Sequence, residues 1–372
     1  MVSMPRRIIE RTTYGARRQS VLSLLCWLLS GVFLASTSAS AQDNKDGKKE
    51  KPVEEKTIYS AADGWPLKLT YYRSTEGKDA AVVILLHAKN ESRMVWTAKD
   101  GFAETLHKRG FAVIALDLRK HGQSKDKDGT TEEETKKATT STGTDKDKSS
   151  KKASGSGDLK PADYVGMIGD LEAVKKMIYE EHQKGHLNMR KTAIVAPAMS
   201  AAIAIAFTAN DWSKKPYDDA STLAARTPRG QDVQALVLLS PDSALPGVVA
   251  TQVAPALRQL PISSLVVVGK NDPHDKDQAK KLFQQLGGDP AKTGAAKKAD
   301  AKKEKGKEKE ADAKEEKLRH YFIPLDAKLR GTELLGKKLG LEEAMANFLK
   351  ENLQELKSPF YEWRDRQSRL AD

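Results

Sequence analysis

The chain of 372 residues contains a single cysteine, Cys26, which lies in an apolar stretch near the N-terminus. The rest of the sequence therefore has no disulfide and no thiolate metal site. Aromatic residues make up only 6% of the chain and are missing from its two most lysine-rich segments, so we do not expect a nucleic-acid partner. A CxxC pair, a phosphate-cradling loop and a dinucleotide fingerprint are also missing, and we predict neither a cofactor nor a metal.

The apolar run at residues 21–35 is too short for a comfortable membrane span, which needs about 20 residues. Five arginines between Arg6 and Arg18 precede this run, and Ala39-Ser40-Ala41 follows it. A positive region, a short apolar region and an A-x-A site are typical of a secretory signal peptide. We predict that residues 1–41 are a signal peptide and that the protein is exported to the periplasm or the extracellular space. A retained signal anchor is the alternative.

The formal net charge is +12, and much of the charge is concentrated in two segments, residues 124–160 and 289–317. Both have little apolar surface to offset the entropy of ordering the chain. We predict that they are disordered charged insertions and that residues 42–56 are a charged linker. Their lysines could bind an anionic surface, although interleaved acidic residues make a solvated loop the simpler interpretation.

The remaining residues alternate between strand and helix patterns. Predicted strands cover residues 57–59, 67–72, 81–86, 111–118, 193–195, 233–239, 262–268 and 320–324, and predicted helices cover 96–109, 161–181, 275–286 and 341–356. A hairpin followed by this alternation indicates an α/β domain over residues 57–356, with a mostly parallel sheet covered on both faces. Residues 357–372 are predicted as a C-terminal tail.

Ligands of such sheets bind at the carboxyl ends of the strands. One of these ends lies in residues 192–207, T-A-I-V-A-P-A-M-S-A-A-I-A-I-A-F, where an apolar strand, small residues and a helix pattern follow one another. This is the layout of a nucleophile elbow, normally G-x-S-x-G. The favoured register places Ala198 at the nucleophile position. The competing register makes Ser200 the nucleophile and requires Pro197, which has no N–H, within a central strand.

Three further phrases accompany the elbow: L-L-H-A at residues 85–88, D-L-R-K-H-G-Q-S at 117–124 and V-V-V-G-K-N-D-P at 266–273. Together they resemble the α/β-hydrolase superfamily, in its esterase, lipase and dienelactone-hydrolase-like branch, over about residues 57–355. The resemblance implies an α/β-hydrolase fold with a mostly parallel sheet of about eight strands, helices on both faces and an N-terminal antiparallel hairpin. It also implies a Ser–His–acid triad.

The resemblance assigns the acid to Asp272 and the oxyanion-hole N–H groups to Ala88 and Met199. Asp272 in N-D-P is equally suited to a turn or a helix cap. Where relatives read H-G-T, this chain reads Arg330-Gly331-Thr332, and no histidine follows His320. Arginine cannot act as a general base at ordinary pH. His274, next to the acid, is the alternative base.

These replacements predict a non-catalytic pseudoenzyme with a binding or scaffolding role, whose ligand would be a small ester-like or envelope molecule. The alternative is an active serine hydrolase that uses Ser200 with Asp272 and an unconventional base. A third hypothesis is an interaction protein that docks on an anionic envelope surface through its lysine-rich segments. Whether the protein is an enzyme is left open by the sequence.

Overall fold

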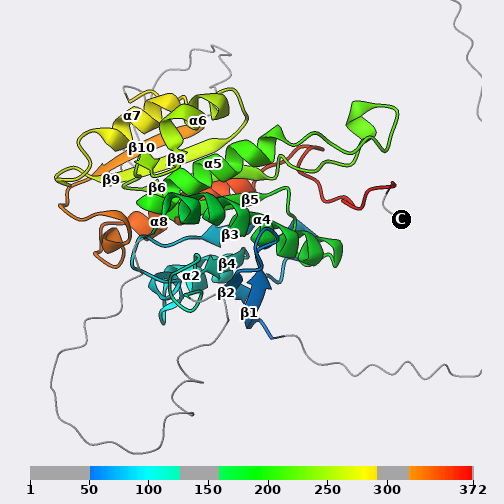
Figure 1. The fold of residues 1–372 in the computed structure, drawn as a ribbon, viewed down its shortest axis with the longest axis horizontal. Helices are drawn as coiled ribbons and strands as arrows, with labels where there is room; N and C mark the ends of the chain where they lie inside the picture. The colour runs from blue at the N-terminus through cyan, green and yellow to red at the C-terminus, as the bar shows by residue number, and fades with distance from the viewer. Residues whose placement is uncertain (1–50, 126–158, 291–317, 371–372) are drawn as a thin grey trace, which may run out of the picture. The chain divides into compact units, whose positions relative to one another are not determined.

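The computed structural model describes residues 51–125, 159–290 and 318–370, whose fold is shown in Figure 1. Its main sheet has 8 strands in the order β1-β2-β4-β3-β5-β6-β9-β10. These strands are β1 (Val53–Tyr59), β2 (Pro66–Tyr72), β3 (Val82–Leu85), β4 (Ala112–Leu116), β5 (Thr192–Pro197), β6 (Val233–Leu239), β9 (Ser263–Gly269) and β10 (His320–Leu325). β2 pairs antiparallel with β1 and β4, and the other pairs are parallel, as predicted.

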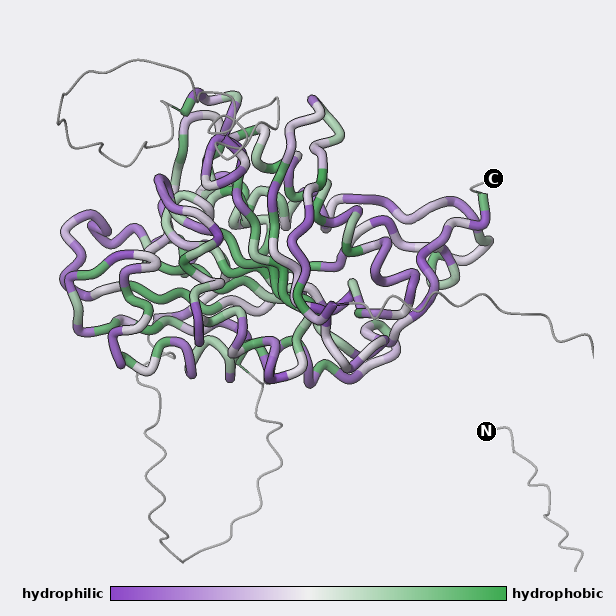
Figure 2. Tube along the Cα trace, turned by 90° about the horizontal axis from the view of Figure 1, so that it is seen from below, coloured by the Kyte–Doolittle hydropathy of each residue, from purple (hydrophilic) through white to green (hydrophobic). Residues whose placement is uncertain are grey.

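The parallel strands in the middle of the sheet are buried on both faces. Every residue of β3, β4, β5, β6 and β9 is buried, whereas the edge strand β1 alternates between exposed and half-buried residues. This burial explains why the central strands read as continuous apolar runs. Figure 2 shows the same pattern, with hydrophobic segments gathered in the interior and hydrophilic ones around them.

Helices cover both faces of the sheet. One apolar cluster joins one face of the strands to α4 (Pro161–Gln183), α5 (Met199–Ser213), α6 (Ala250–Leu257) and α7 (Gln278–Gln285). The other cluster joins the opposite face to α1 (Met94–Thr97), α2 (Phe102–Lys108) and α8 (Leu341–Leu349). In Figure 1, α5 crosses in front of the central strands. A two-stranded sheet of β7 (Ala244–Leu245) and β8 (Val248–Val249) follows β6.

Two predicted helices are interrupted. The helix expected over 96–109 is divided into α1 and α2, because the backbone is non-helical at Ala98 and Asp100 and becomes helical again only after Gly101. A Cβ at this position would lie 2.5 Å from the carbonyl oxygen of Trp96, so only glycine fits. The helix expected over 341–356 is α8 followed by a π-helical turn at Lys350–Gln354.

Pro197 does lie in a central strand, so its missing N–H is no argument against the register in which Ser200 is the nucleophile. It is the last residue of β5 and pairs with Leu239 of β6. The alternation of the parallel ladder directs the missing N–H of Pro197 toward the carbonyl of Leu86, because the Leu86 N–H already donates to Val195. The buried indole Nε1–H of Trp96 donates to that carbonyl at 2.7 Å. A side chain therefore supplies the donor that proline lacks.

The folded body also extends beyond the predicted boundaries. β1 begins inside the predicted linker, and Ser124, assigned to the first insertion, is buried and accepts a hydrogen bond from the N–H of Lys68 at 2.8 Å. The predicted tail packs against the domain, where Arg366 is buried and donates to Asp232 at 2.7 and 3.1 Å. The described part of the segment predicted as a tail, residues 357–370, is therefore attached to the domain by a buried ion pair.

The signal peptide and most of both charged insertions lie outside the described residues. Among the residues that the structure does describe, none of the helices has the length and apolarity needed to cross a membrane.

We expect Trp96→Phe to lower the free energy of unfolding by ~1–3 kcal/mol beyond its packing cost, because the Leu86 carbonyl loses its donor. Pro197→Ala restores a backbone N–H that points to the same oxygen. The loss caused by Trp96→Phe should then be smaller in the Pro197→Ala background, as measured by urea unfolding of the four proteins of this double-mutant cycle.

Trp212→Phe is the matched control, because the Trp212 indole also donates to a backbone carbonyl, that of Val233, at 2.7 Å. Its cost should not depend on residue 197. Equal costs of Trp96→Phe in both backgrounds would show that Pro197 and Trp96 are not coupled.

Candidate active-site cleft

Ala198 occupies the sharp turn between β5 and α5. Its backbone dihedrals are φ 45° and ψ −116°, a region that residues with a side chain rarely adopt. The Ala198 N–H donates to Leu239 at 2.9 Å, and the Ala198 carbonyl accepts from the N–H of Asp242 at 3.1 Å. The strained turn is thus bonded on both sides to the segment that includes the end of β6, and Ala198 lines a cavity of about 820 Å³.

Ser200 lies in the first turn of α5 and does not line this cavity. Its side chain is fully buried, and its hydroxyl donates to the carbonyl of Pro197 at 2.8 Å. This bond satisfies a carbonyl at the end of β5. The geometry gives Ser200 a part in closing the turn.

The two backbone N–H groups that the resemblance assigned to an oxyanion hole, those of Ala88 and Met199, belong to residues that both line the cavity. Met199 is the first residue of α5, so its N–H has no partner within the helix. The Ala88 N–H, in contrast, donates to the carboxylate of Glu91 at 2.9 Å. The other oxygen of that carboxylate accepts a hydrogen bond from the hydroxyl of Thr332. One of the two donors is therefore already occupied by an anion.

Arg330 joins the ends of two strands. Its Nη1 donates to Asp272 at 2.8 Å, and its Nη2 pairs with Asp242. Asp272 follows β9 and Asp242 follows β6, so the guanidinium bridges two neighbouring strand ends. Burial, followed by repulsion from Asp272, raises the pKa of Asp242, although Arg330 opposes this shift. A guanidinium is fixed between two carboxylates at the position predicted for the histidine.

His274 also lines the cavity, and its backbone N–H donates to Asp272 at 2.8 Å. Asp272 thereby combines both interpretations of the N-D-P sequence, since one oxygen caps a turn and the other pairs with Arg330. No group of three or more His, Cys, Asp or Glu residues that could hold a metal occurs within residues 51–125, 159–290 and 318–370.

The loop behind Ala88 is supported by His87, which is completely buried. Its Nε2 accepts the N–H of Leu118 at 3.0 Å, so its Nδ1 must carry the proton that it donates to the Ala88 carbonyl at 2.8 Å. The ring of His121 lies 5.0 Å away. Burial, with a further contribution from His121, lowers the pKa of His87 to about 3.

Next to these histidines, Asp117 at the end of β4 is buried. It accepts the N–H of Arg93 at 2.6 Å and forms an ion pair with the Arg93 guanidinium. The Gln123 N–H donates to the same carboxylate at 2.8 Å. Gly122 is required in this turn because its φ is +51° and a Cβ would collide with the Asp117 carboxylate. The D-L-R-K-H-G-Q-S phrase therefore has a structural basis.

The sequence matches no protein-family model and no curated protein. Among solved structures, it is similar to an acylaminoacyl peptidase from Pyrococcus horikoshii, with a TM-score of 0.50 and 10% identity over 84% of this chain and 43% of the peptidase. It is also similar to a dienelactone hydrolase from Anabaena variabilis, with a TM-score of 0.47 and 14% identity over 82% of this chain and all of the hydrolase. The chain has the α/β-hydrolase fold.

Within this α/β-hydrolase fold, sequence reasoning missed the contact between Glu91 and Thr332 in the cleft. Glu91 follows Ala88 by three residues, a spacing at which a side chain can reach back to a backbone N–H. That spacing was the one available signal. The bond from Thr332 to Glu91 joins positions 241 residues apart, and only the folded chain brings them together.

The buried, neutral His87 predicts a pH dependence of stability. Its pKa is about 3 in the folded protein, against an ordinary value of 6.5. Below pH 6.5 the unfolded chain therefore binds a proton that the folded chain does not, and the free energy of unfolding falls by up to ~1.4 kcal/mol per pH unit. Urea unfolding from pH 7 to pH 4 should show a shallower decline for His87→Gln than for the wild type. Parallel declines would contradict this assignment.

Proposed function

We propose that this chain is an exported α/β-hydrolase-fold protein that no longer performs serine-hydrolase chemistry and instead binds a small ligand in its cleft. The observation that carries the proposal is the methyl group of Ala198 at the apex of the β5–α5 turn. A serine hydrolase needs an oxygen nucleophile at this point, and the loss of one triad member lowers the rate by several orders of magnitude.

The partners of the missing serine also argue against hydrolysis. Arg330 remains charged at ordinary pH and cannot accept a proton from a nucleophile. It also occupies the carboxylates of Asp242 and Asp272, either of which would otherwise be available to orient an imidazole. In these two ion pairs the charges of Arg330, Asp242 and Asp272 neutralise one another, so neither carboxylate is left free to orient a catalytic base.

Glu91 supplies a third argument. An oxyanion hole stabilises negative charge that develops on the substrate oxygen in the transition state. Here a carboxylate already accepts the Ala88 N–H at 2.9 Å, so a substrate oxyanion would lose that donor and meet a like charge. The arrangement opposes the electrostatics that acyl transfer requires.

The alternative that uses Ser200 is disfavoured by its surroundings. Its hydroxyl is fully buried and bonded to Pro197, and it has no access to the cavity that contains His274. A base in the cleft could not reach it without a rearrangement of the first turn of α5.

A binding role is supported by the cavity itself. Its volume is about 820 Å³, and its wall carries charges of both signs, on Lys89, Glu91, Asp242, Arg330 and Glu333, next to Tyr164 and Leu245. Such a wall favours a small polar ligand over a long acyl chain. Together with the predicted signal peptide, this makes a polar molecule of the cell envelope the ligand class that we propose.

A fluorophosphonate probe tests the loss of the nucleophile. We expect no covalent labelling of the wild-type protein and no ester hydrolysis above that of Ser200→Ala, because neither Ala198 nor the buried Ser200 can attack. Labelling is measured by intact-protein mass spectrometry. Wild-type labelling that disappears in Ser200→Ala would overturn the proposal in favour of an active hydrolase.

Rebuilding the site tests its geometry. Ala198→Ser with Arg330→His supplies a nucleophile, a base and the existing Asp272. Adding Glu91→Ala frees the Ala88 N–H, and an oxyanion donor contributes about a hundredfold in rate. We therefore expect the triple variant to hydrolyse a p-nitrophenyl ester about a hundredfold faster than the double variant.

The matched control is Arg330→His with Glu91→Ala, which keeps Ala198 and should stay inactive. Circular dichroism verifies that each variant is folded. A folded triple variant with no more activity than this control would show that position 198 is not the nucleophile position of this fold.

A further inference from the structure

A second site lies at the amino-terminal edge of the sheet, at the opposite end of β5 from Ala198. Arg190 lies just before β5 and is only 2% exposed. Its guanidinium lies 4.2 Å from the ring centroid of Phe360. Its Nε and Nη1 groups are buried and have no hydrogen-bond partner among the residues that the structure describes. A buried guanidinium with unsatisfied donors is rare, because both its charge and its N–H groups lose the water that would solvate them.

The charges around Arg190 make the burial of its guanidinium still less favourable. Burial first, and then the positive charges of Arg366 and Arg364, lower its pKa to about 10. Asp232 acts in the opposite direction, but its two oxygens are already occupied by Arg366 and by Lys175, whose Nζ lies 2.8 Å away. Arg190 therefore remains charged at neutral pH without a counterion of its own.

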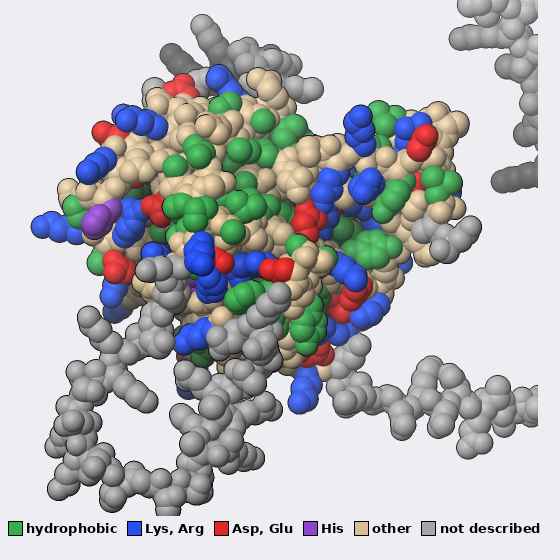
Figure 3. Space-filling view, viewed as in Figure 1, with side chains coloured by type: hydrophobic (Ala, Val, Ile, Leu, Met, Phe, Trp, Pro, Cys, Tyr) green, Lys and Arg blue, Asp and Glu red, His purple; other side chains and the backbone are tan. Residues whose placement is uncertain are grey.

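Arg190 lines a cavity of about 250 Å³ whose other charged lining residues are Lys214, Arg226, Arg229 and Arg364, with no Asp or Glu. Two of these cations are paired outside the cavity, Lys214 with Glu172 and Arg226 with Asp218. In the described part of the chain, no carboxylate pairs with Arg190, Arg229 or Arg364. In Figure 3, several Lys and Arg side chains gather over the part of the surface formed by the loop after α5 and the C-terminal segment.

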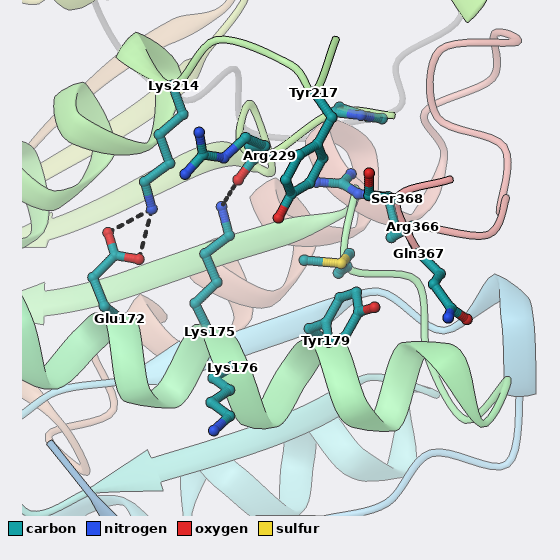
Figure 4. Close-up of a pocket in the computed structure, with 12 residues that line it drawn as sticks. Glu172, Lys175, Lys176, Tyr179, Lys214, Tyr217, Arg229, Arg366, Gln367 and Ser368 are labelled. Carbon is teal, nitrogen blue, oxygen red and sulfur yellow. Dashed lines mark hydrogen bonds and ion pairs between the residues drawn. The ribbon is translucent and has the colours of Figure 1, made fainter. Parts of the chain in front are cut away.

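A second cavity of about 370 Å³ adjoins the first and shares Lys214, Pro228 and Arg229 with it. Figure 4 shows Lys214 on the carboxylate of Glu172 and Lys175 on the backbone carbonyl of Arg229, at 3.1 Å. The Lys175 bond fixes the backbone from which the Arg229 side chain extends. These two contacts hold Lys214 and the backbone of Arg229 in place at the junction of the two cavities.

We propose that this cavity, the Arg190 cavity, binds the phosphate group of a small phosphorylated molecule. Three guanidinium groups that have no carboxylate partner among the described residues favour a ligand with more than one negative charge. A phosphate monoester carries about −1.5 to −2 charges and three acceptor oxygens, whereas a carboxylate carries one charge and two oxygens. Phe360, Leu223 and Pro216 supply an apolar wall for the rest of the molecule.

This site is independent of the cleft function. The residues of β5 separate the Arg190 cavity from Ala198, so the two are roughly 20 Å apart at about 3.3 Å per residue. Its ligand would bind where the loop after α5 meets the C-terminal segment, at a site separate from the cleft.

Isothermal titration calorimetry with inorganic phosphate and glycerol phosphate, at ionic strength held constant with chloride, tests the proposal on the full chain. We expect saturable binding at one site. Arg364→Gln and Arg229→Gln, both exposed and outside the packed core, should each weaken binding about tenfold, since a charge-assisted bond is lost. Arg258→Gln removes an exposed arginine outside the cavity and should have no effect.

The variant Arg190→Met tests whether Arg190 binds a ligand or has only a structural role. Methionine keeps an apolar stem next to Phe360 but removes the unpaired charge, so the thermal midpoint should rise in phosphate-free buffer. Phosphate should raise the midpoint of the wild type, because it binds only the folded protein, and this increase should be missing in Arg190→Met. If this variant does not fold, the Arg364 and Arg229 variants decide the question.

Three results would overturn the proposal. Chloride at equal ionic strength could raise the midpoint as much as phosphate does, which would indicate screening only. Citrate could bind more tightly than glycerol phosphate, which would assign the site to carboxylates. Heparin or RNA could bind while inorganic phosphate and glycerol phosphate do not, which would indicate a polyanion surface.

Discussion

The left-handed turn at Ala198 is the constraint on which the rest of the cleft depends. A φ of 45° at a residue with a side chain costs about 1–3 kcal/mol, and such strain persists only where the surroundings enforce it. The turn is enforced by bonds to Leu239 and Asp242 and by the position of β5 between β3 and β6. The carboxylates of Asp242 and Asp272 meet at Arg330 because the strands that precede them are aligned with β5. The alignment of the parallel strands therefore determines both the fold and the positions of the charged groups in the site.

The proposed loss of hydrolase chemistry is compatible with this geometry, because packing and catalysis make different demands. The turn requires small residues and paired backbone groups, which Ala198 and Ser200 satisfy as well as a reactive serine would. Catalysis requires groups that are held ready but left unpaired. In this cleft Arg330 neutralises two carboxylates, and Glu91 accepts both the Ala88 N–H and the Thr332 hydroxyl. In the proposed non-catalytic site, the charged groups of the cleft are thus paired with one another.

The two ends of the parallel strands differ in how their charged side chains are paired. At the carboxyl edge the charges pair with one another across neighbouring loops. At the amino-terminal ends of the strands, Nε and Nη1 of the buried Arg190 have no hydrogen-bond partner within the described residues, and Arg229 and Arg364 add to the positive charge. The C-terminal segment forms part of this edge, since Arg366 bonds to Asp232 and Phe360 stacks on Arg190. A segment that appears to be a polar tail in the sequence thus helps to build the more strongly charged cavity.

The sequence by itself determined the fold class, the strand order along the chain and the position of the sharp turn. These depend on local patterns: buried parallel strands are continuous apolar runs, and a tight turn needs small residues. It also placed Ala198, Asp272 and Arg330 at strand ends that meet at one edge. Only the tertiary structure decided what these groups touch. The pairing of Glu91 with Thr332, the indole of Trp96 that replaces the N–H of Pro197, and the stacking of Phe360 on Arg190 all join residues that are distant in sequence. Burial and pairing are properties of the packed chain, and no local pattern encodes them.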